Sequence, residues 1–253
     1  MSKVAITYIC TGKYKRFFPA FYGSFRENFC PNDERTFVVI TDDVKWVKAQ
    51  SQGDILAYDT QRRFKKDEDN ADYCKFRKWK DILLAEDFLE TQDYAFYFNG
   101  NTVCMRYTTL DDILGGMEDL CLHRNNSPKA SELSDIRSAA WYEPTGTKYV
   151  MPGLAGGTSK RFLQCARFIE ACRNYDAVFG YDRRDMVPWH DETYYNRYFS
   201  IVMKTRQVME HTLMKGVFAG GFVCAFCSEA DATTVWHSDN DKSNNAHIAI
   251  YDK

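Results

Sequence analysis

Two asparagines separated by one glycine end an apolar, aromatic segment at residues 94–101. Asn99 and Asn101 can donate and accept hydrogen bonds, but they carry no charge that could neutralise a hard cation, whose preferred ligands include carboxylates. Ligands of α/β domains gather at the carboxyl ends of strands, so two amides at this point would face a cleft. The alternative is an ordinary exit from a strand into a turn, because Asn and Gly are common turn residues.

A second group with potential chemistry is the sequence Trp-His-Asp-Glu at residues 189–192. Pro188 blocks a helix before this group, and His190 or Asp191 can begin a new one. The dipole of a helix favours acidic residues in its first turn, so the two carboxylates also have a purely structural explanation. That explanation does not account for the preceding Trp-His pair, which leaves a role in a binding site open.

Glycine accompanies two further apolar segments. Residues 8–14 read Tyr-Ile-Cys-Thr-Gly-Lys-Tyr, and residues 149–157 read Tyr-Val-Met-Pro-Gly-Leu-Ala-Gly-Gly. Glycine lets a backbone approach a ligand closely, and it also serves in tight turns, so both interpretations stay open for each segment.

The elements that must position these groups alternate between strands and helices. Apolar runs that predict buried strands occupy residues 4–10, 37–41, 55–58 and 94–98. Aromatic residues recur at helical spacing between Phe17 and Phe29, which predicts a helix packed on a sheet. A second helix is predicted over residues 72–89. This order of strands and helices is typical of the nucleotide-binding half of an α/β fold.

The later part of the chain adds another helix and two loops. The helix follows the second glycine-rich segment, and its predicted buried face consists of Phe162, Cys165, Ala166, Ile169 and Cys172. Residues 61–70 are polar and charged, which predicts an exposed loop. Residues 124–135 lack any periodicity, which predicts a mobile loop over the cleft.

Composition predicts a single soluble domain. The 253 residues are 45% hydrophobic and 15% aromatic, which is enough to bury one substantial core. The net charge of -2 gives no global attraction to nucleic acid or to an anionic membrane. No apolar run is long enough for a membrane anchor, and nine scattered cysteines are typical of free thiols in a reducing cytoplasm. Cys224 and Cys227 have the spacing of a metal or redox pair, but an apolar strand is the favoured interpretation.

Together, four segments resemble glycosyltransferase family 6, the family of the histo-blood-group A and B transferases and the α-1,3-galactosyltransferases. In order along the chain they are residues 8–14, 98–101, 153–157 and 189–199. The most specific piece is Trp-His-Asp-Glu followed by Asn and an aromatic residue. The chain is most similar to the small bacterial members, which carry Asn-X-Asn and work without a metal ion.

The resemblance implies an α/β fold of the GT-A type, in one domain with a mostly parallel central sheet. Residues 1–253 would form a single catalytic domain, with about 1–100 as the nucleotide-binding half. Residues 101–253 would form the acceptor half and a C-terminal lid. The implied reaction is the retaining α-1,3 transfer of galactose or N-acetylgalactosamine from a UDP-sugar to a galactoside acceptor, fucosylated or plain. No cofactor, metal ion, nucleic acid or membrane anchor is implied.

The resemblance also assigns residues to the donor site. Backbone groups of Ile9 to Thr11 and the ring of Tyr14 would hold the uridine, and Arg77 would lie near the phosphates, with Lys75 as the alternative. The full implied donor set is Ile9, Cys10, Thr11, Tyr14, Arg77, Asn99, Asn101, Met151, Pro152, Gly153, Asp191 and Lys242.

Glu192 is the implied catalytic residue. A carboxylate on the β face of the anomeric carbon can stabilise an oxocarbenium-like centre, either as a nucleophile or as an electrostatic partner. Asp191 would bind hydroxyl groups of the donor sugar. The implied acceptor contacts are His123, Trp189, His190 and Glu192.

Some positions depart from the family pattern. Pro152 stiffens a segment that is normally glycine-rich and that selects the donor sugar. The acceptor-loop motif Glu-Arg-Arg is reduced to Asp135-Ile-Arg137, and the C-terminal tail keeps Lys242 but is less basic than in relatives. Fewer cations give weaker stabilisation of the leaving UDP, which predicts slow turnover.

Two rival functions stay open, of which these departures favour the first. The first is a carbohydrate-binding or catalytically vestigial module that retains a UDP-sugar cleft. The second is a metal-dependent transferase that uses other carboxylates, such as Asp93 or Asp111.

Overall fold

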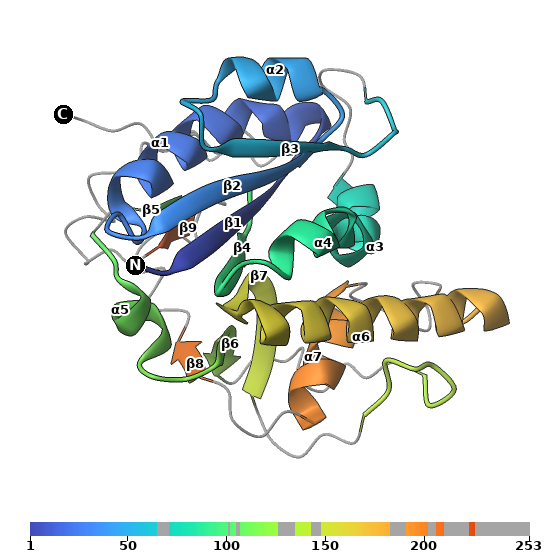
Figure 1. The fold of residues 1–253 in the computed structure, drawn as a ribbon. Coiled ribbons are helices and arrows are strands. Elements are labelled where there is room, and N and C mark those ends of the chain that lie inside the picture. Colours follow the sequence, from blue (N-terminus) through green and yellow to red (C-terminus); the bar gives the residue numbers. More distant parts are fainter. Residues whose placement is uncertain are drawn as a thin grey trace.

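A seven-stranded sheet with helices on both faces forms the centre of the fold (Figure 1). The computed structural model describes residues 1–64, 71–100, 102–104, 107–125, 135–142, 148–182, 191–201, 206–209 and 223–225. Within this part of the chain the arrangement is a single α/β domain with a mostly parallel sheet, as the sequence predicts.

The strands of the large sheet are β1 (Lys3–Cys10), β2 (Glu34–Thr41), β3 (Ile55–Asp59), β4 (Tyr94–Phe98), β6 (Asp119–Asn125), β7 (Lys148–Thr158) and β8 (Arg206–Met209). Their spatial order is β3-β2-β1-β4-β7-β6-β8. The pairs β3–β2, β2–β1, β1–β4 and β6–β8 are parallel, whereas β7 is antiparallel to both β4 and β6. A small second sheet pairs β5 (Thr102–Cys104) with β9 (Val223–Ala225).

The helical segments are η1 (Gly12–Phe17), α1 (Phe18–Asn28), α2 (Val44–Ala49), α3 (Ala71–Ile82), η2 (Leu83–Ala85), α4 (Glu86–Leu89), α5 (Leu110–Leu114), α6 (Ser159–Phe179) and α7 (Asp191–Ile201). Helices α1 and α2 cover one face of the sheet, and α3, α6 and α7 cover the other (Figure 1). No helix in the described ranges is long and apolar enough to cross a bilayer.

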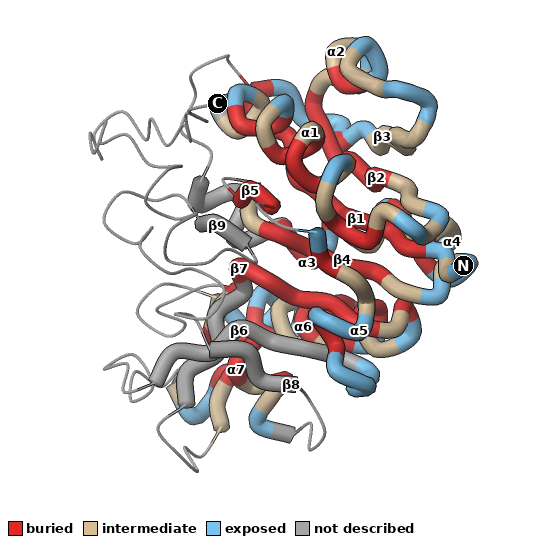
Figure 2. The backbone as a smooth tube through the Cα atoms, turned by 90° about the vertical axis from the view of Figure 1, so that its left-hand side faces the viewer, coloured by how far each residue is buried: buried red, intermediate tan, exposed pale blue. Residues whose placement is uncertain are grey.

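Successive side chains of the central strands point to opposite faces of the sheet, which divides the core into two layers. Tyr8, Phe96 and Phe98 pack against the aromatic stripe of α1. Ile9 and Tyr97 belong to the opposite layer, with α3, α6 and α7. The backbone of β1, β2 and β4 is accordingly buried along most of its length (Figure 2). Odd-numbered residues of β4 therefore face the helices that carry the candidate catalytic group.

The predicted strands and the aromatic helix are confirmed, with small differences in length. The helix predicted over residues 72–89 consists of three consecutive pieces, α3, η2 and α4. Of the exposed loop predicted at residues 61–70, residues 61–63 are exposed as predicted and Phe64 is buried, while residues 65–70 lie outside the described residues. The loop predicted over residues 124–135 begins too early, because β6 continues to Asn125.

Cysteine side chains behave as expected at the five positions where the structure describes them. Free thiols are found at Cys10, Cys30, Cys104, Cys165 and Cys172. Cys224 lies in β9, so the apolar-strand interpretation holds for that residue, while Cys227 lies outside the described residues.

Candidate functional site

The carboxyl ends of β1 and β4 are joined through Tyr8. Its hydroxyl oxygen lies 2.9 Å from the carbonyl oxygen of Gly100 and 3.2 Å from that of Tyr14, so it can donate to either. A Cβ added at Gly100 would lie 3.1 Å from this hydroxyl and 3.4 Å from Cδ1 of Tyr14. The glycine between the two asparagines thus allows Tyr8 and Tyr14 to pack against the turn after β4, which brings the first two motif segments together.

The third and fourth segments meet at a bulge in β7. Cys121 of β6 pairs with Ala155, but the next residue, Leu122, pairs with Met151. The three residues of β7 between them, 152–154, therefore have no partner in β6. Pro152, the first of them, has no N–H to donate to a ladder. The backbone N–H of Asn99 donates to Gly153 O at 2.9 Å.

Helix α7 also binds this bulge. The hydroxyl of Tyr195 donates to Leu154 O at 3.1 Å, and its ring stacks on Trp79 of α3 with 5.5 Å between centroids. The first turn of α7, which begins at Asp191, is therefore fixed relative to the end of β4 and the bulge in β7.

A buried lysine connects these elements. Nζ of Lys78, on α3, lies 2.5 Å from Oδ2 of Asp191, and the two side chains are 7% and 3% exposed. The same Nζ lies 4.9 Å from the centre of the Tyr97 ring. The Tyr97 hydroxyl in turn donates to Oδ1 of Asn99 at 3.3 Å. A continuous series of contacts thus runs from the amide at the end of β4, through α3, to the first residue of α7.

The charge of Lys78 is held in place by its surroundings. Burial alone lowers the pKa of Lys78, but the nearby Asp191, Tyr97 and Glu192 raise it, and the net pKa lies above the ordinary value. A buried carboxylate is costly without a partner, so the ammonium group of Lys78 makes it possible for Asp191 to stay charged away from water.

A comparison with known proteins indicates the class of protein to which the chain is similar. Over 210 residues the chain is 26% identical to the O-antigen biosynthesis glycosyltransferase WbnI of Escherichia coli, an alignment that covers 78% of this chain and 81% of that protein. The chain is a distant homologue of a glycosyltransferase. No protein-family model matches it.

A glycosyltransferase acts on a nucleotide-sugar donor and an acceptor, and the residues predicted to hold the donor begin at the carboxyl end of β1. Ile9 and Cys10 are the last two residues of this strand and Thr11 follows it, and all three are buried. Burial raises the pKa of Cys10 well above its ordinary value, so its thiol stays neutral and is suited to packing rather than to nucleophilic attack.

Other predicted site residues lie in β6 and β7 or outside the described residues. His123 of β6 pairs with Val150, and Met151 pairs with Leu122; for these residues and Pro152 the structure describes the backbone. The residues outside the described ranges are Asn101, Trp189, His190 and Lys242. The roles assigned to all of these side chains stay predictions.

Arg77 and Lys78 lie in different surroundings although they are neighbours. Nε of Arg77 forms an ion pair with Oδ1 of the buried Asp81 at 3.2 Å, one turn along α3. Lys78 contacts Asp191 instead. The role of Arg77 near the donor phosphates is untested by this geometry.

Sequence reasoning missed Lys78, because Arg77 and the alternative Lys75 were the basic residues of this helix to which the resemblance assigned a role. A signal was present, since Lys78 lies four residues before Ile82, which is fully buried, and beside the buried Trp79. A lysine on the apolar face of a helix indicates a buried charge that needs an acidic partner.

The carboxylates suggested for metal binding are dispersed. Asp93 precedes β4, at the opposite end of this strand from Asn99, where it accepts a hydrogen bond from Lys3 N at 2.8 Å. Asp111 lies in the first turn of α5. Among the described residues, His, Cys, Asp and Glu form no group of three or more that could hold a metal ion. Metal independence itself stays a prediction.

Helix α7 is also anchored from behind by Asp176 of α6, which is completely buried. Its Oδ2 accepts hydrogen bonds from the hydroxyls of Tyr194 at 2.8 Å and Ser138 at 2.5 Å, and its Oδ1 accepts from Ala139 N at 2.7 Å. Burial and the hydrogen bond to Asp176 raise the pKa of Tyr194. One carboxylate therefore fixes α7 to α6 and to residues 135–142.

Replacing Tyr194 with Phe should lower the free energy of unfolding by about 1–3 kcal/mol, because Asp176 would lose one of its buried donors. Urea denaturation provides the measurement. The matched control is Tyr175→Phe. Tyr175 is about half exposed and lies on the same face of α6 as Phe179, so this change should alter the free energy of unfolding by less than about 0.5 kcal/mol. Equal stability of both variants and the wild type would contradict an anchoring role for Asp176.

Proposed function

We propose that this protein is a metal-independent, retaining α-1,3-glycosyltransferase. It would move galactose or N-acetylgalactosamine from a UDP-sugar to a galactoside acceptor, fucosylated or plain. The observation that carries the proposal is the contact series from Asn99 through Tyr97 and Lys78 to Asp191, which joins the motif after β4 to the start of α7. The distant homology to a glycosyltransferase supports the transferase class.

In this proposal the donor lies across the carboxyl edge of the sheet. Tyr14 and the backbone at the end of β1 hold the nucleoside, and the amide groups of Asn99 and Asn101 donate hydrogen bonds to the diphosphate. Asp191, oriented by Lys78, accepts hydrogen bonds from hydroxyls of the donor sugar.

Glu192 is the next residue along α7, so the Lys78–Asp191 ion pair also fixes its backbone. In the reaction the bond between C1 and the UDP oxygen breaks, UDP leaves with the electron pair, and an acceptor hydroxyl oxygen bonds to C1. Glu192 stabilises the positive charge that develops on the sugar. The acceptor's proton passes to an oxygen of the departing diphosphate, which lies on the face of the sugar from which the acceptor attacks.

UDP should bind without a divalent ion, because neutral amides replace the carboxylates that would hold one. Titration calorimetry in EDTA and in Mg²⁺ or Mn²⁺ should give affinities within about threefold of each other, a difference under about 1 kcal/mol. The matched variant Asn99→Asp places a negative charge near the diphosphate, and its UDP affinity should fall in EDTA and recover in part with Mn²⁺. Wild-type binding that occurs only with a metal would refute the metal-free assignment.

One observation favours a second candidate, a carbohydrate-binding module that has lost efficient chemistry. The guanidinium of Arg137 is engaged by Asp135 through contacts of 2.8 and 2.9 Å, which leaves this reduced acceptor-loop motif paired with itself. Release of UDP from UDP-galactose or UDP-N-acetylgalactosamine in the absence of acceptor separates the two candidates, since a binding module leaves the donor intact.

A further inference from the structure

A buried carboxylate that the catalytic proposal does not use lies at the end of β2. Cys10 of β1 pairs with Thr41 of β2, so the residues that follow, Thr11 and Asp42, leave the sheet side by side at the candidate edge. The Asp42 side chain is only 2% exposed. A charge this deeply buried needs partners, and the identity of these partners shows what it holds together.

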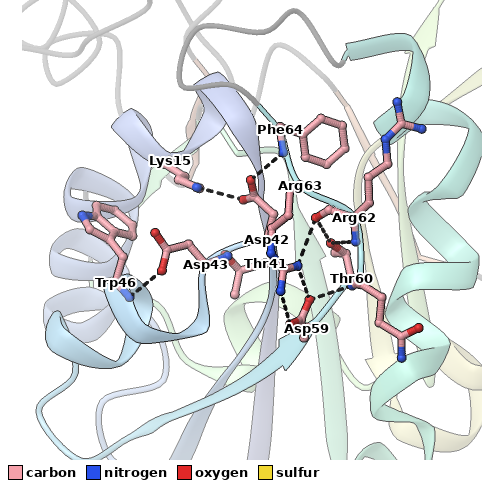
Figure 3. A network of polar contacts seen from close by, with 11 residues as sticks. Lys15, Thr41, Asp42, Asp43, Trp46, Asp59, Thr60, Arg62, Arg63 and Phe64 are labelled. Carbon is pink, nitrogen blue, oxygen red and sulfur yellow. Dashed lines mark hydrogen bonds and ion pairs between the residues drawn. The ribbon is translucent and has the colours of Figure 1, made fainter.

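Asp42 has partners on two different segments (Figure 3). Its Oδ1 forms an ion pair at 3.0 Å with Nζ of Lys15 in η1, and its Oδ2 accepts a hydrogen bond at 3.2 Å from the backbone N–H of Phe64, which follows β3. Both Lys15 and Asp42 also act on the pKa of Cys10, so the pair lies close to the end of β1.

Each of the two segments that contact Asp42 also makes further contacts of its own. Next to Lys15, Tyr14 donates its N–H to Thr11 O at 3.0 Å, and its carbonyl faces the Tyr8 hydroxyl. After β3, Thr60 N donates to Thr41 O at 2.9 Å, and the Phe64 ring lies 5.0 Å from the guanidinium carbon of Arg62. Asp42 is thus the shared side-chain link between the turn that presents Tyr14 and residues 60–64.

We propose that Asp42 is a positioning residue for the nucleoside of the donor, acting through Lys15 and the backbone of Phe64. The inference rests on the proposed function, because it places the nucleoside beside Tyr14. The ion pair with Lys15 and the hydrogen bond with Phe64 set the border of the nucleoside site before the ligand arrives. Preorganisation of this kind improves affinity by avoiding the ordering of loops on binding.

The neighbouring Asp43 supplies a matched control. It too is an aspartate after β2, but its side chain caps α2 by accepting from Trp46 N at 3.0 Å (Figure 3). Asp42→Asn should weaken the binding of both UDP and uridine by about tenfold, whereas Asp43→Asn should change either affinity by less than about twofold. The loss should be the same for uridine as for UDP, because the effect acts on the nucleoside and not on the phosphates. In turnover, the donor KM should rise while kcat stays nearly constant.

The route through Lys15 is tested by a double-mutant cycle. Lys15→Met should weaken UDP binding by about threefold or more, and the double variant Asp42→Asn/Lys15→Met should bind no worse than Asp42→Asn, because both changes break one interaction. If Asp42→Asn does not fold, the UDP affinity of Lys15→Met alone tests the inference. Lys15 is partly exposed, so its replacement should leave the fold intact. Unchanged UDP affinity in that variant would overturn the inference.

The outcomes separate this inference from the proposed function. A wild-type protein that does not bind UDP overturns both. A wild-type protein that binds UDP, with a folded Asp42→Asn variant that binds UDP and uridine equally well, overturns only the role of Asp42. A loss restricted to UDP, with uridine affinity unchanged, also overturns it, because the pair would then act on the diphosphate.

Discussion

Replacing Glu192 with Gln should lower the rate of transfer by at least about 10²-fold, a magnitude typical of removing one preorganised electrostatic group. Glutamine keeps the size and hydrogen-bonding capacity of the side chain but removes the negative charge that would stabilise the sugar cation. UDP affinity should change by less than about threefold, because the proposed role of Glu192 is at the anomeric carbon and not at the nucleotide.

The measurement pairs a transfer rate with calorimetric UDP affinity for the same protein preparations. Glu27→Gln is the control, since Glu27 is exposed on α1, on the opposite face of the sheet from α7, and it should leave both quantities unchanged. Near-normal transfer by the Glu192 variant would remove it from the mechanism. A collapse of UDP binding would instead indicate that Glu192 is needed for the start of α7.

Replacing Lys78 with Met should lower the free energy of unfolding by about 3–5 kcal/mol, the usual cost of removing one partner from a buried ion pair. The change leaves Asp191, which is 3% exposed, without its cation. Transfer activity should fall as well, because Asp191 would no longer be held in one orientation. Lys80→Met is the control on the same helix, and as an exposed position it should stay within about 0.5 kcal/mol of the wild type.

A double variant distinguishes stability from function at this site. Lys78→Met combined with Asp191→Leu replaces two buried charges by apolar groups, which often restores stability. We expect the double variant to unfold closer to the wild type than Lys78→Met does, and still to lack transfer activity. Recovery of activity together with stability would show that the ion pair serves only the fold.

The pH dependence of this contribution follows from the raised pKa of Lys78. A group whose pKa is raised on folding contributes its full stability below its unfolded pKa, about 10.4 for lysine, and loses it as the pH rises through the folded value. The difference in stability between wild type and Lys78→Met should therefore not decrease as the pH rises from about 6 to 9. A decline within that range would contradict the pairing.

Local patterns in the sequence were sufficient to predict most strands of the central sheet. Residues 4–10 and 94–98 are apolar except for Thr7 because these strands are covered on both faces, and the helical spacing of the aromatic residues from Phe17 to Phe29 predicts a helix packed on such a sheet. The glycine-rich segment before α6 was harder to predict as a strand, because glycine is uncommon inside strands and Gly156 lies within β7. A Cβ there would lie 2.1 Å from Cδ1 of Phe96, so the glycine makes room for a ring on the neighbouring strand.

The contacts that join the motif segments could not be predicted from such local patterns. Which basic residue of α3 turns inward depends on where α7 packs, and the sequence of α3 alone does not contain that information. The same holds for Asp42, whose partners Lys15 and Phe64 come from segments that are brought together only by the order of β1, β2 and β3 in the sheet. The roles of the motif residues were assigned from the family resemblance and stay predictions, while the contacts of Lys78 and Asp42 became visible only in the tertiary structure.

The ion pair between Lys78 and Asp191 has a consequence for the order of events in folding. Its two residues lie in opposite halves of the chain, so closing this contact requires ordering a long intervening segment, which is an entropically slow step. During synthesis, Lys78 is made well before Asp191 and must stay solvated until α7 docks. The candidate site is therefore assembled late, and a nascent chain that has completed β1 to β4 already has the sheet edge but not the group that would act on the sugar.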